Sequence, residues 1–505
     1  MNETCINIVR GRKSKIMPAI ITNKFRIHMS EQFQESFSEA SGNNYYLGIG
    51  RPQPYGTLTR PDGRTDNQGT DANPITPADS VIEETACYDD LLAAKRITSS
   101  DVSFVIPRRN WTSGTVYDMY RHDYGNRITG GTSTQTSTSG ATNLFDATFY
   151  IKNSANRVYK CLDNNNGGTV SDEPTATTTS VISTSDNYKW KYMYTLSAAQ
   201  QSSFLSTDFM AVATDSTVSG DAINGEINII KIKSAGTGGT DGTHTSVPIR
   251  GDGSSGVCSV TIASGAVTAV SVTTKGTGYT YAYIRVADIN TAGGGSLTGA
   301  ELDCIIEPQG GHGFDAVKEL GGFFLMLNQS LEGTETANTG DYTASNDFRK
   351  IVLIRDPKSS GSAATATTLR ATKAIKIASS PTPGTFQADE KITQATTGAV
   401  GKVVEWDSAN NILYYIQTGF TDAGVDSNGN KSAFSGANVV TGATSSATGT
   451  PDSSSSATVN NVVFSSGYST AELDENSGDV IYIENRAPIV RAADQTENIK
   501  LIIEF

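Results

Sequence analysis

The stretch KVVEWDSANNILYYI, residues 402–416, sets the structural class of the chain. Its two halves, residues 402–406 and 412–416, are rich in valine, isoleucine and aromatic residues, which favour extended backbone. Between them lies DSANN, a polar run of the residue types that form tight turns. The stretch therefore predicts a β-hairpin.

The segments on either side of this hairpin are poor in apolar residues. SSGSAATATT at 359–368 and TGATSSATGTPDSSSSAT at 441–458 cannot hold a core alone, and we expect long surface loops there. Residues 359–477 as a whole are interpreted as a Gly/Ser/Thr-rich β domain.

An internal duplication marks a second block with this composition. INIIKIKSAGTG at 227–238 is echoed by VTAVSVTTKGTG at 267–278, and each copy is followed by two more strand-like runs. Two copies of a three-strand unit predict a small all-β domain over residues 205–310, with a two-fold internal repeat. A longer solenoid would need at least three copies, so it is the second choice.

Residues 17–200 have an ordinary globular composition. Apolar residues at four-residue spacing predict a helix over 28–41, with Ser30 as its N-cap, and a second helix is expected over 86–97. Predicted strands cover 45–49, 104–106, 156–163 and 188–196. The chain is therefore expected to be a predominantly β, α+β, multidomain protein with β-sandwich- or barrel-like domains and a few short helices.

The charge balance argues against nucleic-acid binding as the main task. The 505 residues include 39 Lys and Arg against 52 Asp and Glu, for a net charge of −13, whereas such binding needs a basic face. The longest apolar run, FFLML at 323–327, is far shorter than the ~20 residues of a membrane-spanning helix. The N-terminus lacks the apolar stretch of a secretory signal, and Met17 is a candidate natural start, which would make residues 1–16 an extension. Five scattered cysteines fit a reducing cytoplasm.

Catalytic, cofactor and metal motifs fail at specific positions. The four histidines are scattered, and TTGAVGKVV at 396–404 lacks the first glycine and the final Ser or Thr of a phosphate loop. DNNNGGTVSDEP at 163–174 begins like a calcium loop but has Gly167 and Pro174 at two ligand positions. We therefore expect no enzyme, no cofactor, no metal and no small-molecule substrate. Paired carboxylates for glycoside cleavage stay open, since only their spacing in space defines them.

The segment FVIPRRNWTSGTVYDMYRHD, residues 104–123, concentrates arginine and aromatic residues. Its arginines could neutralise phosphates while its aromatic rings stack on bases. The alternative is an apolar strand stopped by Pro107 and followed by a polar loop. The acidic composition favours the alternative.

Two longer segments carry a family resemblance. DSVIEETACYDDLLAAKRITSSDVSFVIPRRNW at 79–111 and GDVIYIENRAPIVRAADQTENIKLIIEF at 478–505 closely resemble the baseplate wedge protein family, gene product eight, of T-even-type contractile-tailed bacteriophages. Further similar strings are GIGRPQPY at 48–55, VYKCLD at 158–163, NYKWKYMYTL at 187–196 and NDFRKIVLIRDPK at 346–358.

The resemblance implies a structural protein of the virion without known catalysis. Family members form homodimers that pack with other wedge proteins around the tail hub, so we expect a homodimer, wedge-protein partners, and neither nucleic acid nor membrane. The expected location is the virion tail baseplate, after assembly in the host cytoplasm. The rival classes are a receptor-binding, fibre-like adhesin and a tail-associated polysaccharide depolymerase.

The resemblance also suggests a division of the chain and a set of interface residues. The expected parts are an extension (1–16), wedge core segments (17–204, 311–358 and 478–505) and two inserted β domains (205–310 and 359–477). The structural or interface candidates are Pro107, Arg108, Arg109, Trp111, Arg486, Pro488, Asp494, Gln495 and Thr496. The arginines are expected to act as planar, multiply donating anchors to carboxylates or carbonyls.

The last run of the sequence, IKLIIEF at 499–505, predicts a strand locked into a sheet. Leu501, Ile503 and Phe505 would share one face of it. Upstream, Pro488 is expected to fix a turn.

Overall fold

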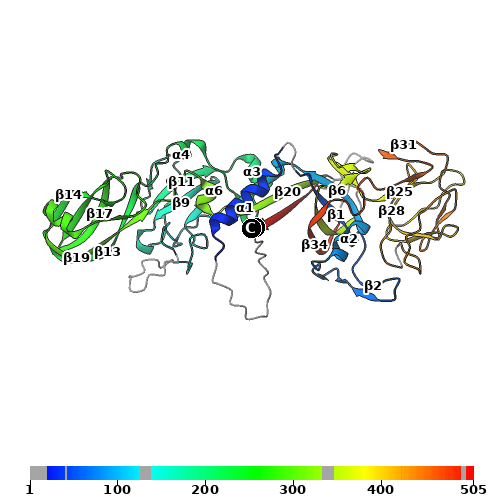
Figure 1. Cartoon of the computed structure of the whole chain (residues 1–505), viewed down its shortest axis with the longest axis horizontal. Helices are drawn as coiled ribbons and strands as arrows, with labels where there is room; N and C mark the ends of the chain where they lie inside the picture. The colour runs from blue at the N-terminus through cyan, green and yellow to red at the C-terminus, as the bar shows by residue number, and fades with distance from the viewer. Residues whose placement is uncertain (1–19, 40–42, 125–137, 333–345, 422–423, 491–495) are drawn as a thin grey trace, which may run out of the picture. The chain divides into compact units, whose positions relative to one another are not determined.

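The computed structural model describes residues 20–39, 43–124, 138–332, 346–421, 424–490 and 496–505 (Figure 1). Strands in several sheets dominate and the helices are few and short, which confirms the predominantly β, α+β, multidomain class. The chain divides into two compact units. Unit 1 is Met1–Gln32, Phe104–Leu325 and Ile503–Phe505, and unit 2 is Phe33–Ser103 and Met326–Ile502. The expected extension, 1–16, lies outside the described residues.

The helices are all short. They are α1 (Asn23–Glu35), α2 (Val81–Ala86), α3 (Ala198–Phe204), α4 (Ser216–Gly220), α5 (Val286–Ile289) and α6 (Ala316–Leu320). Among the described residues, none is long and apolar enough to cross a membrane.

A five-stranded antiparallel sheet forms the centre of unit 2. Its order is β24 (Thr368–Arg370), β6 (Leu91–Ile97), β1 (Tyr45–Gly50), β21 (Asp347–Arg355) and β34 (Asp479–Val490). Every residue of β1 is buried, as expected for a central strand, and the predicted strand at 45–49 is confirmed. Tyr46, Leu91, Val352 and Leu473 pack in one core beside the sheet.

The predicted helix over 86–97 is wrong. Only Ala86 belongs to a helix, α2; residues 87–90 form a 3₁₀ turn and 91–97 form strand β6. The alanines, Lys95 and Arg96 favour a helix locally, but β6 pairs on both edges, with β1 and with β24. Those ladder bonds and the burial of residues 91–94 outweigh local preference.

The second sheet of unit 2 has seven strands and contains the predicted hairpin. Its order is β30 (Thr448–Gly449), β29 (Val440–Gly442), β26 (Lys391–Gln394), β27 (Ala399–Asp407), β28 (Ile412–Ile416), β25 (Lys373–Lys376) and β33 (Tyr468–Ser469). Strands β27 and β28 confirm the hairpin, and Asn411 supplies the positive φ that its turn requires. Ile375, Ile392, Val403 and Leu413 belong to the core of this sheet.

The sequence block 359–477 holds more than this seven-stranded sheet. It includes β24 and Leu473, which belong to the five-stranded sheet and its core. The two chain ends of the seven-stranded sheet meet at Arg370 and Glu472. The Arg370 backbone N–H donates to Glu472 Oε2 (2.9 Å), and the Glu472 N–H donates to the Arg370 carbonyl (2.8 Å).

We predict that residues 373–469 can be replaced by a short Gly-Ser linker without unfolding the five-stranded sheet. The chain ends are already joined by the Arg370–Glu472 hydrogen bonds, and loop length costs little entropy. Hydrogen exchange of β1 and β21 is expected to stay slow. Removal of 359–477 is the control and is expected to give insoluble protein, because it also takes β24 and Leu473 from the core. Equal behaviour of the two deletions would contradict the prediction.

Unit 1 contains a four-stranded antiparallel sheet. Its order is β10 (Ile182–Ser183), β11 (Lys189–Thr195), β9 (Arg157–Asp163) and β8 (Tyr150–Lys152). Strands β9 and β11 confirm the predictions for 156–163 and 188–196 and pair directly with each other. Tyr159 and Trp190 are fully buried there.

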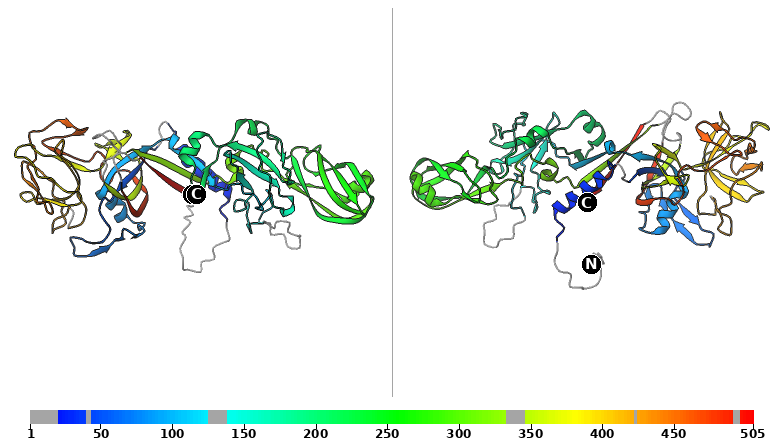
Figure 2. Two further views of the ribbon diagram at one scale, coloured as in Figure 1. Left: turned by 180° about the vertical axis from the view of Figure 1, so that it is seen from behind. Right: turned by 45° about the horizontal axis from the view of Figure 1, so that its top comes forward.

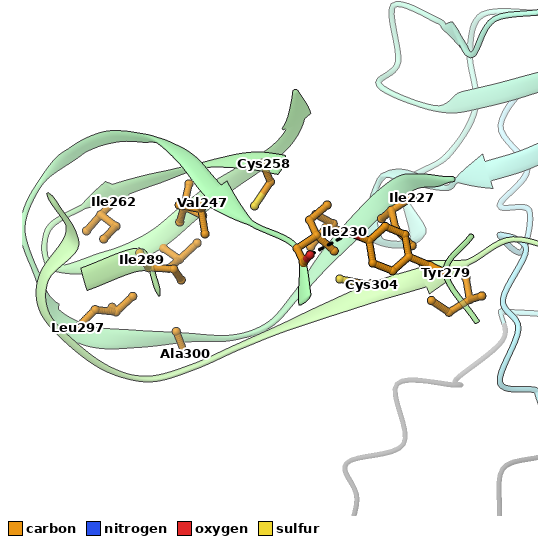
Figure 3. Packing of buried hydrophobic residues seen from close by; sticks show 14 residues of the cluster. Ile227, Ile230, Val247, Cys258, Ile262, Tyr279, Ile289, Leu297, Ala300 and Cys304 are labelled. Atoms are coloured by element: carbon orange, nitrogen blue, oxygen red, sulfur yellow. Dashed lines mark hydrogen bonds between the residues drawn. The ribbon is translucent and has the colours of Figure 1, made fainter. Parts of the chain in front are cut away.

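Residues 227–306 of unit 1 form a group of strands with its own core. The pair β13 (Ile227–Gly239) and β19 (Gly295–Ile306) accompanies the sheet of β14 (Gly242–Pro248), β16 (Val257–Ala263) and β17 (Ala266–Thr274). These strands stay together, in green, in all views (Figure 2). Val247, Ile262, Ile289 and Leu297 point toward one another between them (Figure 3).

The two copies of the duplicated motif begin β13 and coincide with β17. They are neighbours, because the Ile227 N–H donates to the Lys275 carbonyl (3.0 Å). They take different ladder partners, however: β13 pairs with β19 and β17 with β16.

A further four-stranded sheet joins distant parts of the sequence. Its order is β12 (Phe209–Ala211), β7 (Val102–Pro107), β20 (Phe324–Glu332) and β35 (Thr496–Glu504). Strand β35 confirms the predicted last strand, with Ile499 and Leu501 buried. The remaining strands form small pairs: β2 (Thr57–Thr59) with β3 (Thr65–Asn67), β4 (Gly69–Thr70) with β5 (Asn73–Pro74), β15 (Arg250–Gly251) with β18 (Ala282–Tyr283), β22 (Lys358–Ser359) with β23 (Ser362–Ala363), and β31 (Thr458–Val459) with β32 (Val462–Val463).

Helix α1 begins earlier than predicted, so Ser30 is not its N-cap. Thr22 takes that place, with its hydroxyl accepting the Phe25 N–H (3.2 Å). Ser30 is fully buried within the helix, where its Oγ lies within hydrogen-bond distance of the carbonyls of Ile27 (2.7 Å) and Gly322 (3.1 Å). A serine inside a helix can bond a carbonyl of the preceding turn, and such bonds are not visible in a spacing pattern.

Candidate functional site

The two predicted arginines at the end of β7 bind backbone carbonyls of unit 1. Arg108 donates from its guanidinium to the Ser206 carbonyl (2.7 Å). Arg109 donates to the carbonyls of Phe145 (3.2 Å) and Ala147, and its guanidinium lies 4.4 Å from the ring centroid of Tyr150. These bonds tie two loops to the strand end, and a role of the arginines between subunits remains a prediction.

Pro107 and Trp111 lie beside these arginines. Pro107 ends β7 and pairs with Phe209 of β12. Trp111 is half-buried, and its backbone N–H donates to the Lys152 carbonyl (2.9 Å). Its indole nitrogen is buried with no hydrogen-bond partner in the described part of the chain.

The other predicted residues lie in β34 and β35 or outside the described residues. Arg486 and Pro488 are half-buried in β34, where the register with β21 shifts between Asn485 and Ile489. The turn expected at Pro488 is therefore wrong: the strand continues, and the proline sits in a bulge, where its missing N–H breaks no ladder bond. Thr496 is exposed at the start of β35. Asp494 and Gln495 lie outside the described residues.

A pocket of about 300 Å³ in unit 1 brings Arg109 close to the last residues of the chain. Arg26 of α1 also lines it, 3.7 Å from the ring centroid of Phe323. The guanidinium of Arg26 donates to the carboxylate of Glu504 and to the backbone carbonyl of Phe505. The pocket wall is thus built from five segments that are separated in sequence.

The most concentrated group of buried charges in unit 1 is Lys160, His312 and Glu319. The Lys160 ammonium, at the centre of β9, donates to Glu319 Oε2 (2.8 Å) and to His312 Nδ1 (2.8 Å). It also lies 4.0 Å from the ring centroid of Tyr120. The second carboxylate oxygen of Glu319 accepts the Gly313 N–H (2.7 Å), so both oxygens of this buried carboxylate are hydrogen-bonded.

The pKa values assign the charges in this cluster. Burial alone would raise the pKa of Glu319, but attraction to Lys160 and the interactions with His312 together outweigh it and hold the pKa at about 2. Burial and the Lys160 charge lower the pKa of His312 to about 3, so its imidazole is neutral. Since Nδ1 accepts from Lys160, the proton sits on Nε2, which faces Glu307 Oε1 at 3.8 Å.

Glu307 connects this cluster to a polar pocket of about 420 Å³, which Lys191, Asn228 and His312 also line. Asn228 Nδ2 donates to Glu307 Oε1. Burial, together with the nearby Glu226 carboxylate, raises the pKa of Glu307 to about 8. Perturbed groups in a cleft are the usual sign of a functional site, but buried ion-pair networks perturb pKa values as well.

The geometry of the cluster favours a structural role. Lys160 is held by two partners, both carboxylate oxygens of Glu319 accept hydrogen bonds, and the His312 ring packs edge-on against Tyr120. Among the described residues, no group of three or more His, Cys, Asp or Glu side chains could hold a metal ion. Sequence reasoning missed this cluster, although a lysine at the centre of the apolar strand VYKCL was a usable signal, because a buried lysine requires a partner.

We predict that Glu307→Gln stabilises the protein at alkaline pH. Between the usual carboxyl pKa and about 8, the folded state keeps a proton on Glu307 that the unfolded chain has lost. Stability therefore falls as the pH rises through this window, by about 2–5 kcal/mol when complete. Glutamine stays neutral and retains an oxygen that can accept from Asn228, so the variant avoids this loss.

Urea denaturation from pH 4 to 8.5 measures the effect. The free energies of unfolding of variant and parent are expected to diverge progressively above pH 5. Glu301→Gln is the control, because Glu301 is exposed and pairs with Lys233 on the surface. Parallel pH profiles of parent and Glu307→Gln would contradict the prediction.

Comparison with known protein families gives a match. The family described as bacteriophage T4, Gp8 matches residues 19–171 and 429–505. No curated protein sequence matches the chain. The matched ranges contain both long segments on which the resemblance rests, and leave out residues 172–428.

Proposed function

Because the chain belongs to the bacteriophage T4 Gp8 family, whose members are structural proteins of the phage baseplate, we propose that it is a wedge subunit of a contractile tail. In this role it assembles with other wedge proteins around the tail hub. Membership of the family places it in the virion tail, and assembly in the host cytoplasm is part of the proposal.

The observation that carries the proposal is that the two matched ranges contribute three of the five strands of one sheet. Strands β1 and β6 come from 19–171 and β34 comes from 429–505, with β21 between them in the order of strands. Leu91 of the first range and Leu473 of the second share one core. The matched ranges thus meet in one sheet, although β21 and β24 of that sheet come from residues 172–428, outside the match.

Reconstruction of the intact particle by electron cryo-microscopy tests the wedge assignment. The expected result is density for the five-stranded sheet of this chain in the baseplate, repeated around the six-fold axis. Density at the tip of a tail fibre would instead support the adhesin alternative and overturn the proposal.

We also propose that the subunit pairs with a second copy through helix α1. Phe25 and Met29 of α1 are four residues apart and 53% and 41% exposed, and Ile21, just before the helix, is 66% exposed. The opposite face of the helix holds the buried residues Ile27 and Ser30. Side chains four residues apart form one stripe, and a two-fold axis can pack such a stripe against its own copy.

We predict that Phe25→Asp converts the dimer to a monomer. A charge in the centre of the stripe would have to be buried without a partner when two copies meet. Native mass spectrometry of the full chain measures the state. Val463→Asp is the control, because Val463 is also an exposed apolar residue (67%) and lies on the hairpin β31–β32. A parent protein that is monomeric or trimeric, or a dimer that survives the substitution, would contradict this interface.

A further inference from the structure

The outer edge of strand β34 in unit 2 is open. The strand ends the five-stranded sheet and, among the described residues, forms a ladder only with β21; the short strand β5 contacts it without pairing. Half of its backbone N–H and C=O groups therefore point away from the sheet. Such an edge is a template for a further strand unless proline, a charge or a covering segment blocks it.

A groove of about 250 Å³ runs beside this edge. The chain from Pro77 to Ser80 forms one wall, and Val480 to Ile483 form the other. Apolar side chains stand exposed at the groove: Ile481 on the strand is 43% exposed, and Val81, next to the wall residue Ser80, is 74% exposed. Exposed aliphatic side chains gathered at a groove mark a contact surface rather than ordinary surface scatter.

The rim of the groove is acidic. Asp79 and Glu84 line it and form no ion pair with a described residue. Glu484 follows on the strand, where its carboxylate accepts the Tyr482 hydroxyl (2.9 Å). Arg355 is bound to Asp479 at the start of β34, and Arg486 lies two residues beyond Glu484, so carboxylates outnumber cations along the rim. This acidic rim therefore favours a bound segment that carries positive charges.

One end of the open edge is closed. Asn485 Nδ2 donates to the Ile75 carbonyl (3.0 Å), and the bulge with Pro488 follows directly. A strand added to this edge can therefore pair along Asp479–Glu484 but cannot continue past Asn485.

We propose that this edge binds an extended segment of another protein, with apolar side chains at alternate positions and lysine or arginine at its flanks. Backbone hydrogen bonds to residues 479–484 supply the affinity, and the groove takes the alternate side chains. A second copy of this chain is the poorer occupant, because its net charge is −13. The inference concerns this edge alone and does not depend on the wedge assignment.

Three labelled peptides and the full-length protein test the proposal. The first is KVTVTVK; the second is EVTVTVE, with the same backbone and acidic flanks; the third is KVTVTVK with its five central backbone nitrogens methylated. Fluorescence anisotropy measures the affinity, and hydrogen exchange with mass spectrometry measures protection of residues 479–485. We expect KVTVTVK to bind at least tenfold more tightly than either of the others and to slow exchange in this segment.

Two variants place the binding site. Ile481→Lys puts a repelling charge in the groove and is expected to weaken KVTVTVK at least tenfold. Val463→Lys makes the same change at an exposed valine on hairpin β31–β32 and is expected to have no effect.

Three results would overturn the proposal. These are equal binding of the methylated peptide, absence of protection at 479–485, or protection that rises with protein concentration alone. The last of these would assign the edge to a second copy. None of the three bears on the location of the protein in the particle.

Discussion

Removal of residues 500–505 is expected to abolish recovery of a folded, soluble subunit. The deletion takes away Leu501, which is buried, and the half-buried Ile502, Ile503 and Phe505. Burial of these four side chains contributes about 4–7 kcal/mol to the free energy of unfolding, if Leu501 is counted as fully buried and the other three as half-buried. The deletion also removes the bond from the Phe505 N–H to the Phe323 carbonyl (3.1 Å). A domain is stable by only about 5–15 kcal/mol, so little stability remains.

Two point variants distinguish the loss of buried side chains from any general effect of a shorter C-terminus. Leu501→Ala is expected to lower the free energy of unfolding by about 2–4 kcal/mol, because it leaves a cavity in a buried position. Thr496→Ala, at an exposed position of the same strand, is expected to change it by less than about 0.5 kcal/mol. Soluble yield and urea denaturation measure both. A truncated chain that unfolds at the parent's urea concentration would show that the strand is peripheral.

Replacement of Glu319 by alanine is expected to lower the free energy of unfolding by about 3–5 kcal/mol. The substitution leaves the buried Lys160 ammonium without its counter-charge. The side chain of Lys160 is fully buried, and among the described residues Glu319 is its one carboxylate partner within hydrogen-bond distance. Burial already lowers the pKa of Lys160, and the attraction of Glu319 opposes that shift. Without the carboxylate, the lysine is expected to deprotonate in the folded state.

The pH dependence of the Glu319→Ala variant carries the signature of this mechanism. Its free energy of unfolding should rise between pH 7 and 10. Over this range Lys160 is neutral in the folded state but still binds a proton in the unfolded chain, so raising the pH favours the folded state. Lys318→Ala is the matched control, since Lys318 forms exposed pairs with Asp315 and Glu31 and should cost less than about 1 kcal/mol. The double variant Lys160→Met with Glu319→Leu should recover most of the loss. A single variant as stable as the parent would contradict a charged pair.

The strands predicted correctly from the sequence are those whose own residues favour extended backbone, whatever strand they pair with. Tyr45–Gly50, Arg157–Asp163 and Ile412–Ile416 are dense in β-branched or aromatic residues, and the turn before Ile412 carries its own signal. Leu91–Ile97 was missed because its helix-favouring residues are overruled by pairing on both edges. The bulge at Pro488 was missed because a register shift depends on the partner strand.

The candidate site was predictable only in part. The pair Arg108 and Arg109 stood out in the sequence, and the structure shows both bound to loop carbonyls. The Lys160 cluster draws its partners from residues that follow β19, a long way down the chain, so no spacing rule could join them. What the sequence shows is the anomaly, a lysine among apolar neighbours, and not the partner that explains it.

The order of strands in the five-stranded sheet has a consequence for synthesis of the protein. Strand β1 can pair with β6 early, but its other edge waits for β21, where Tyr45 meets Arg355. Translation adds about 5–20 residues per second, so tens of seconds pass between synthesis of β1 and synthesis of β21. During that time one edge of β1, which is fully buried in the finished protein, has no partner strand. Substitutions in β1 and β21 should therefore reveal themselves as temperature-sensitive synthesis, with low yield at high temperature and normal behaviour of the protein once made.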